Sequence, residues 1–245
     1  MEPLVRGHYR ARLAQDTGDV AAAQRLRHLC FHGREGVDAD RFDDLCDHVL
    51  IEDVQRGDLV CCYRLLPLGS GAALPDSYAG QFYDLGRLTG FSAPLLELGR
   101  FCCHPSVTDP DVLRLAWGAM TRRVDHLGIG LLFGCASFSG TDPAPLRPAF
   151  AQLAAHHLAP PDRAPQPKAP ETYAYAQDLA GQVPDARQAA RLLPPLLRTY
   201  LGMGGWVSDH AVIDRQMGTL HVFTGVEIAA IPPARSRALR MVAGG

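Results

Sequence analysis

The chain has 245 residues, a formal net charge of -2 at pH 7 and a sequence pI of about 6.5. This length fits a single α/β domain with excursions, and the near-neutral charge provides no global field that would favour nucleic acid as a partner. No segment approaches the ~18 apolar residues of a membrane span, and the first residues lack the apolar run of a signal peptide, so we expect a cytoplasmic protein with at most peripheral membrane contact.

The first third of the chain alternates between strand and helix signals. The expected elements are a strand at 5–13, a helix from 19 to about 32, and two strands at 47–53 and 58–66. Asp19, or Gly18 before it, can cap the helix, and an acidic loop, GREGVDADRFDDLCD, follows it. Because a turn containing Gly57 separates the two strands, they are expected to form a hairpin.

The middle of the chain contains the clearest local signals. The expected elements are an irregular segment at 69–95 with a short helix, a strand at 96–103, a helix at about 111–127 and a strand at 129–137. Asp109-Pro110 can open the long helix and Gly128 can end it. The last strand is a continuous apolar run, which is typical of a strand buried on both faces.

The remaining elements are interrupted by proline. We expect a helix near 146–158, a short helix from Pro194 or Pro195 to about Gly202, and strands at 205–213 and 219–228. Five prolines between 160 and 170 exclude regular structure and predict an excursion near 159–172. The arginine-rich tail from about residue 233 is expected to be loose. The whole chain, 1–245, is then a single domain.

Seven cysteines occur, and none has C-x-x-C or secreted-framework spacing. The adjacent pairs Cys61-Cys62 and Cys102-Cys103 lie among apolar strand residues, so we expect reduced, buried thiols. No metal is predicted, because a tetrahedral zinc site usually shows paired ligand spacing. Cys135 has no paired base nearby in sequence, and packing is its predicted role.

The strand LLELGRF carries an acid that could perform proton transfer. Alternation places Glu97 on the same face as Gly99 and Phe101. Burial raises the pKa of a carboxyl group, and such a carboxylate can take a proton from an attacking ammonium, directly or through one water. The alternative is a structural salt bridge from Glu97 to Arg64 or Arg100.

The acidic loop and several basic segments allow two interpretations each. The loop aspartates could form a negative pocket for an amine substrate with a second positive charge, or a solvated acidic surface. Arg114, Arg122 and Arg123 could meet an acidic carrier protein, or form a solvated helix face. The basic, leucine-rich segment 187–200 could lie on a membrane surface, although core packing of its leucines competes.

Two segments could bind a pantetheine arm. The small residues Gly134, Ala136 and Ser137 would allow close approach of the arm to a strand edge, or they could simply be core. The loop CHPSVTDP precedes a helix N-terminus that could bind one phosphate, as phosphopantetheine would require.

Together these blocks resemble the ornithine-acyl carrier protein N-acyltransferase family. ELGRFCCHP resembles its ELGRSCV block, and LVCCYRLLP is similar to its VGTYRLL strand; RLRHLCFHGREGVDADRFDDLCDHVLIED, FGCASFSGTDP and LLRTYLGMGGWVSDHAVIDRQMGTLHVF complete the pattern. The skeleton is also similar to the acyl-homoserine-lactone synthases. The family's serine after ELGR is Phe101 here, its late lysine is Arg198, and its late asparagine and aspartate are Gly218 and His221.

The resemblance implies a GNAT-like α/β fold with a mixed central sheet flanked by helices, and splayed strands that form the acyl-donor cleft. It implies transfer of a 3-hydroxyacyl group from acyl carrier protein to the α-amine of ornithine, giving lyso-ornithine lipid. The donor is 3-hydroxyacyl-phosphopantetheine on the carrier protein, and no cofactor is bound permanently. Glutamine or lysine as acceptor, a signal synthase and a non-catalytic acyl-binding protein are the alternatives.

The resemblance also implies roles for individual residues. Glu97 and Arg100 are the expected catalytic pair, with Glu97 as proton acceptor. The expected substrate-binding residues are Arg27, Phe31, Asp43, Asp44, Asp47, Arg64 and Ser137. Of these, the three aspartates would hold the acceptor's ammonium, or brace Arg27 and Arg64 around the cleft. The expected donor-binding residues are Phe101, Cys102, Cys103 and His104, whose backbone N–H groups would stabilise the developing oxyanion.

Overall fold

The computed structural model describes residues 2–244, which divide into two compact units that interleave along the chain. The first unit takes the chain up to Pro67, Leu96–Ile129 and the segment from Pro233 onward. The second takes Leu68–Leu95 and Gly130–Pro232. A single domain over 1–245 stays a prediction.

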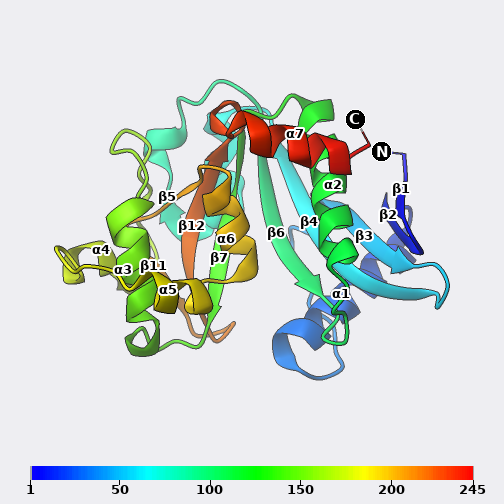
Figure 1. Cartoon of the computed structure of the whole chain (residues 1–245), viewed down its shortest axis with the longest axis horizontal. Helices are drawn as coiled ribbons and strands as arrows, with labels where there is room; N and C mark the ends of the chain where they lie inside the picture. Colours follow the sequence, from blue (N-terminus) through cyan, green and yellow to red (C-terminus); the bar gives the residue numbers. More distant parts are fainter. Residues whose placement is uncertain (1, 245) are drawn as a thin grey trace. The chain divides into compact units, whose positions relative to one another are not determined.

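The first unit is built on a sheet with helices on both faces (Figure 1). Its elements are β1 (Leu4–Arg6), β2 (Tyr9–Leu13), α1 (Thr17–His32), β3 (Asp47–Asp53), β4 (Asp58–Leu68), β6 (Leu95–Cys103), α2 (Pro110–Leu127) and α7 (Pro233–Val242). The strand order is β1-β2-β3-β4-β6. Cys62 packs against α1, whereas its neighbour Tyr63 donates a hydrogen bond to the Ala116 carbonyl of α2 at 2.9 Å. Because successive strand residues point to opposite faces, α1 and α2 cover opposite sides.

Local signals explain where the two long helices begin and end. Asp16, not Asp19 or Gly18, caps α1, since its carboxylate accepts the Asp19 N–H at 2.9 Å. The prediction for α2 is confirmed: Asp109 caps it, Pro110 opens it, and Gly128 ends it at φ 62°. The predicted hairpin of β3 and β4 is also confirmed, with β4 two residues longer than expected.

Two predictions for the ends of the chain were wrong. The strand expected at 5–13 is two strands, because Gly7 at φ 59° turns the chain and lets β1 pair antiparallel with β2. The tail from 233 is not loose but forms α7, which packs against α2. Arg240 binds the Asp125 carboxylate at 2.8 Å, and a Cβ at Gly118 would lie only 3.0 Å from the Val242 carbonyl. The helix is therefore stabilised by a partner distant in sequence.

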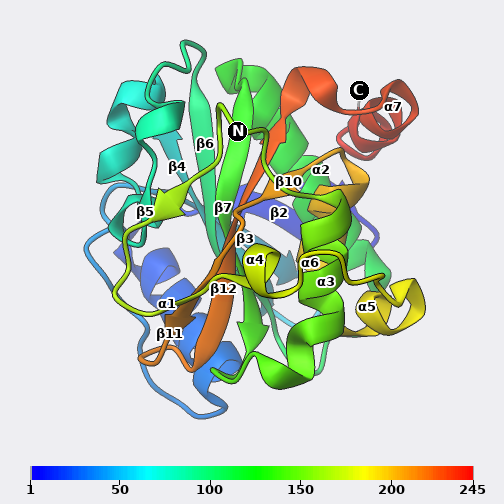
Figure 2. The ribbon, with the colours of Figure 1, turned by 90° about the vertical axis from the view of Figure 1, so that its left-hand side faces the viewer.

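The second unit also places its sheet between two layers (Figure 2). Its strands are β5 (Tyr83–Asp84), β7 (Leu131–Ser139), β8 (Gln166–Pro167), β9 (Thr172–Tyr173), β10 (Trp206–Val207), β11 (Ala211–Asp214) and β12 (Thr219–Glu227). Its helices are α3 (Arg147–His156), α4 (Tyr175–Asp178), α5 (Ala186–Leu192) and α6 (Pro195–Gly202), with 3-10 turns at Gly71–Asp76, Ala79–Gln81, Gly86–Leu88, Ala144–Leu146 and Ile228–Ala230. The strand order is β7-β12-β11-β9, with β10 also paired to β12.

Successive side chains of β12 point to opposite faces of the sheet and so contact two different layers of this unit. Val222 packs with Phe150 of α3 and Leu197 of α6 in one buried cluster. The neighbouring residues His221 and Phe223 contact Tyr83 of β5 instead, with ring centroids 5.6 and 5.7 Å away. Helices thus cover one face and the segment carrying β5 covers the other.

Two predictions for this unit need correction, and one choice between alternatives is decided. The strand expected at 205–213 is divided into β10 and β11, because the Ser208 hydroxyl donates to the His210 carbonyl at 2.7 Å and turns the chain. The proline-rich excursion does contain regular pairing, since Gln166–Pro167 pairs antiparallel with β5. Leu193 and Leu197 of the basic segment are buried in the core, which favours packing over a membrane surface.

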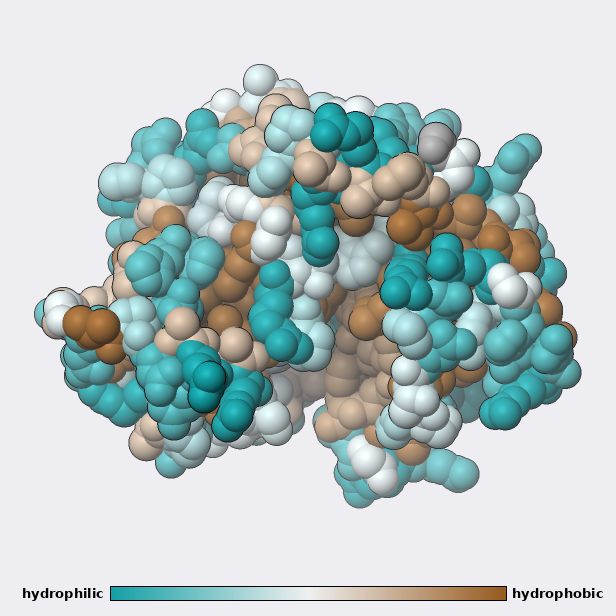
Figure 3. Space-filling view, viewed as in Figure 1, coloured by the Kyte–Doolittle hydropathy of each residue, from teal (hydrophilic) through white to brown (hydrophobic). Residues whose placement is uncertain are grey.

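On the surface, small hydrophobic patches lie among mostly hydrophilic side chains on the visible face of each unit (Figure 3). Isolated exposed residues such as Val183 and Met241 are ordinary for a globular chain. Within residues 2–244, no helix combines the length and the hydropathy needed to cross a bilayer.

Gly225 makes a close contact that can be tested by mutation. It lies opposite Trp206 in the β10–β12 ladder, and a Cβ at Gly225 would lie 2.6 Å from the indole ring. Trp206 is buried and stacked on Phe223, so the ring has little room to move. We expect Gly225→Ala to lower the free energy of unfolding by about 1–3 kcal/mol in a urea titration.

The matched control is Gly69→Ala, at an exposed position where a Cβ would meet no atom within 4 Å. It should change stability by less than about 0.5 kcal/mol. Equal stability of the two variants would contradict the proposed clash with Trp206.

Candidate active site

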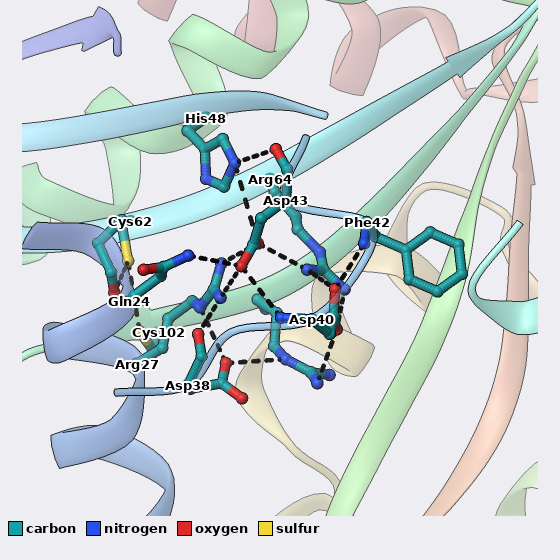
Figure 4. Close-up of polar contacts among 12 residues, drawn as sticks. Gln24, Arg27, Asp38, Asp40, Phe42, Asp43, His48, Cys62, Arg64 and Cys102 are labelled. Carbon is teal, nitrogen blue, oxygen red and sulfur yellow. Dashed lines mark hydrogen bonds and ion pairs between the residues drawn. The ribbon is translucent and has the colours of Figure 1, made fainter. Parts of the chain in front are cut away.

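Three arginines and three aspartates of the first unit form one ionic network (Figure 4). The arginines come from α1, β4 and β6, and the aspartates from the loop between α1 and β3. The network consists of Arg27, Arg64, Arg100, Asp38, Asp40 and Asp43. It joins sequence segments that lie up to 73 residues apart, counted from Arg27 to Arg100.

Asp43 lies at the centre of this network. Arg27 binds its carboxylate in a bidentate manner, with Nη1 2.8 Å from Oδ1 and Nη2 2.8 Å from Oδ2. Arg64 Nη1 donates to Asp43 Oδ1 at 2.8 Å, and Gln24 Nε2 donates to Oδ2 at 2.9 Å. Bidentate guanidinium–carboxylate pairs fix geometry as well as charge. By binding Arg27 of α1 and Arg64 of β4, Asp43 therefore fixes the position of α1 relative to β4.

The other two carboxylates attach Arg100 to the same network. Asp38 accepts from Arg27 Nε at 2.9 Å and from Arg100 Nε at 3.0 Å. Asp40 accepts from Arg64 Nη1 at 2.6 Å and from Arg100 Nη2 at 3.2 Å. Each of the three aspartates therefore binds two arginines, and the six formal charges cancel.

This pairing differs from a solvated surface and from an unpaired negative pocket, and it agrees with the third interpretation for Asp43, which binds both Arg27 and Arg64. The central aspartates are neither a solvated surface nor an unpaired negative pocket, since Asp43 and both of its arginines are 7% exposed or less. Burial alone would raise the pKa of Asp43, but the hydrogen bonds from Arg27, Gln24 and Arg64 outweigh it and lower the pKa. Asp43 is therefore ionised at neutral pH and orients its arginines.

Glu97 and Arg100 lie close together on β6. Glu97 is 4% exposed and lies between buried Leu96 and Leu98. Arg100 has φ 54°, and it is the one non-glycine residue within 2–244 with positive φ. Such strain persists only where surrounding contacts hold it, and here the ion pairs with Asp38 and Asp40 do so. The left-handed residue also interrupts the strand alternation from which the shared face of Glu97 and Phe101 was predicted.

Cys46, from the acidic loop, lies within electrostatic range of Glu97. Burial raises the pKa of the Cys46 thiol to about 12; Arg64 opposes this shift, and the negative charge of Glu97 adds to it. The Cys46 thiol is thus neutral. The charges that act on it come both from Glu97 and from three members of the ionic network, Arg64, Asp43 and Asp40. Cys46, Gln24 and His48, whose Nε2 lies 2.9 Å from the Asp43 carbonyl oxygen, were not among the predicted site residues. Only Gln24 left a signal, one helical turn before Arg27.

The remaining predicted substrate residues are dispersed. Asp47 binds Arg123 Nε of α2 at 3.0 Å, and Asp44 is exposed. Phe31 is partly buried against the cluster of α1, β3, β4 and β6 residues. Ser137 lies on β7 in the second unit, exposed and opposite His221 of β12.

The predicted donor residues follow Arg100 on β6. Phe101 stacks on Tyr63 with ring centroids 5.3 Å apart. Cys102 and Cys103 continue the strand, and the His104 N–H donates to the Val60 carbonyl at 2.8 Å. This bond removes the His104 N–H from the predicted oxyanion-binding set.

The predicted phosphate site at the start of α2 is not supported. The Asp109 carboxylate already accepts the Asp111 N–H at 2.9 Å, and both acids oppose an anion there. The arginines that could meet a carrier protein, or form a solvated helix face, are engaged within the first unit: Arg114 binds Asp111, Arg122 binds the Ala243 carbonyl, and Arg123 binds Asp47.

The fold and the sequence together define a class of enzyme. Residues 23–118 match the acetyltransferase (GNAT) domain family. The structure is similar to that of FeeM, an N-acyl amino acid synthase from uncultured soil microbes, with a TM-score of 0.50 and 10% identity over 99% of this chain and 98% of that one. The GNAT-like fold with a mixed sheet flanked by helices is confirmed, and the protein is an N-acyltransferase.

Sequence comparison identifies the family within this class. The chain is 34% identical to the L-ornithine N(alpha)-acyltransferase of Rhodobacter capsulatus, over 91% of each sequence. It is 31% identical to that of Brucella abortus, over 92% of this chain and 86% of the relative. The chain belongs to the L-ornithine N(alpha)-acyltransferase family.

Proposed function

We propose that this protein transfers a 3-hydroxyacyl group from acyl carrier protein to the α-amine of L-ornithine, forming lyso-ornithine lipid. The observation that carries the proposal is the 34% identity with an enzyme named L-ornithine N(alpha)-acyltransferase, extending over 91% of both chains. The buried acid Glu97, on a strand held by the ionic network, supports an amine-acylation site. We place the enzyme in the cytoplasm, at most peripherally on the membrane.

In the proposed reaction, the ornithine nitrogen attacks the thioester carbonyl directly and no acyl-enzyme forms. Glu97 accepts the proton that the attacking amine releases. A buried carboxylate is a stronger base than an exposed one, because burial disfavours its charged form. The pantetheine thiolate then leaves and is protonated, so the donor returns as the free carrier-protein thiol and no resident cofactor is needed.

The neighbouring residues would position the reactants. Arg27, Arg64 and Arg100 are immobilised by aspartates, so they need no reordering when substrate binds. The backbone N–H groups of Phe101, Cys102 and Cys103 remain candidates for stabilising the oxyanion, a contribution of about 3–4 kcal/mol for one donor in known enzymes. Asp44, Asp47, Phe31 and Ser137 stay proposed acceptor contacts, with Asp47 also bound to Arg123.

The proposal is tested by incubating the pure protein with 3-hydroxyacyl carrier protein and separate acceptors, with products identified by mass spectrometry. We expect acylation of ornithine and of Nδ-acetylornithine, but none of Nα-acetylornithine, because only the α-amine reacts. Acylation of glutamine or lysine in preference to ornithine would overturn the proposal that ornithine is the acceptor. A homoserine lactone formed from S-adenosylmethionine, or acyl-chain binding without turnover, would overturn the reaction.

A further inference from the structure

Five of the seven cysteines lie on three neighbouring elements of the first unit, α1, β4 and β6. They are Cys30, Cys61, Cys62, Cys102 and Cys103. All are free thiols. Within the described residues 2–244, no group of three or more His, Cys, Asp or Glu side chains is arranged to hold a metal ion. The chemistry that this cluster offers is therefore that of neighbouring thiols.

Cys102 lies between two other thiols. Its Sγ atom is 3.7 Å from Cys62 Sγ of β4 (Figure 4). On the other side, Cys30 of α1 packs against the cluster that contains Cys102, and its Sγ donates to the carbonyl of the next residue, Cys103, at 3.3 Å. A single sulfur on β6 is thus within reach of both neighbouring elements.

Exposure separates these three thiols. Cys62 is 1% exposed and Cys102 is 7% exposed, whereas Cys30 is only partly buried. The hydrogen bond with Cys102 lowers the pKa of Cys30, against the opposing effect of burial. Because the thiolate is the reactive form and Cys30 is the most exposed of the three, a small oxidant reaches Cys30 before Cys62 or Cys102. Cys103 is also partly buried and its pKa is also lowered, but the thiol next to it is Cys61, not Cys102.

We infer that Cys30 and Cys102 form a reversible disulfide when the protein meets a hydroperoxide. The Cys30 thiolate attacks the peroxide oxygen, the O–O bond breaks, and Cys30 becomes a sulfenic acid while the peroxide is reduced to an alcohol or water. The Cys102 thiol then attacks Cys30 Sγ, and the S–S bond forms as the departing hydroxide takes the Cys102 proton and leaves as water. The two thiols are oxidised by two electrons, which the hydroperoxide accepts.

The position of this disulfide gives it a structural consequence. It would join α1, which supplies Arg27, to β6, which supplies Glu97 and Arg100. In cytosolic proteins, disulfides are usually transient or redox-sensing rather than structural. The inference concerns thiol chemistry and does not depend on which amino acid the enzyme acylates.

Trypsin places the relevant cysteines on three short peptides, 28–34, 57–64 and 101–114. The full chain is treated with hydrogen peroxide, alkylated, digested without reductant and analysed by mass spectrometry. We expect peptide 28–34 to be linked to peptide 101–114, with the link lost on treatment with dithiothreitol. Absence of this link, or a link only between 57–64 and 101–114, would overturn the inference.

Serine variants distinguish the participating sulfurs. Cys30→Ser and Cys102→Ser should each abolish the link between 28–34 and 101–114. Cys103→Ser should retain it, although Cys103 shares a peptide with Cys102, and Cys46→Ser serves as a control at another partly buried thiol. A link that persists in Cys30→Ser or disappears in Cys103→Ser would assign the chemistry to other residues.

Discussion

Replacing Glu97 with Gln is expected to lower kcat by about 10²- to 10⁴-fold, the range that general acid–base catalysis contributes. The amide has the shape of the carboxylate but cannot accept the proton of the attacking amine. Glu97 is 4% exposed, so few other acceptors could replace it unless a water enters. Steady-state kinetics with 3-hydroxyacyl carrier protein and ornithine measure the effect, and KM for the donor should change little.

Two further measurements separate catalysis from folding. The acidic limb of the pH profile of kcat/KM should disappear in Glu97→Gln if that limb reports the protonation of Glu97. The matched control is Glu35→Gln, the same chemical change at an exposed position, which should retain wild-type kcat. An unaltered kcat in Glu97→Gln, with a folded protein by circular dichroism, would remove Glu97 from the mechanism.

Asp43→Ala is expected to lower the free energy of unfolding by about 3–5 kcal/mol, because it leaves two buried guanidinium groups without their shared carboxylate. Arg27 and Arg64 are 1% and 2% exposed, and Asp43 contacts both at 2.8 Å. Urea titration measures the loss. Asp44→Ala is the matched control one residue away, at an exposed position, and should remain within about 0.5 kcal/mol of wild type.

The stabilising effect of Asp43 should also depend on pH in a defined direction. Its pKa in the folded protein is lower than the ordinary value of 3.8, so its contribution is fully present above that value. The contribution is lost as pH falls through the lowered folded-state pKa. The stability difference between wild type and Asp43→Ala should therefore shrink on acidification below about pH 4. A difference that stays constant down to pH 2 would contradict a role for the ionised carboxylate.

Local signals predicted the elements that depend on nearby residues. The bounds of α2 follow from Asp109-Pro110 and Gly128, and the β3–β4 hairpin follows from two alternating runs around Gly57. The same signals failed for 5–13, where one glycine converts a strand into a hairpin, and for α7, whose stability comes from packing on α2. Helix formation of that kind depends mainly on tertiary packing of one face.

The order of residues was enough to identify the family of this protein, because the ELGRFCCHP and FGCASF blocks and the spacing of its acids and arginines are properties of the chain order. It also drew attention to Glu97, an acid within an apolar strand. Which charges meet depends on the folded chain: Asp43 binds Arg27 and Arg64, and Asp47 binds Arg123. Electrostatic pairing depends on distances of a few ångströms between segments far apart in sequence, and the fold alone sets those distances.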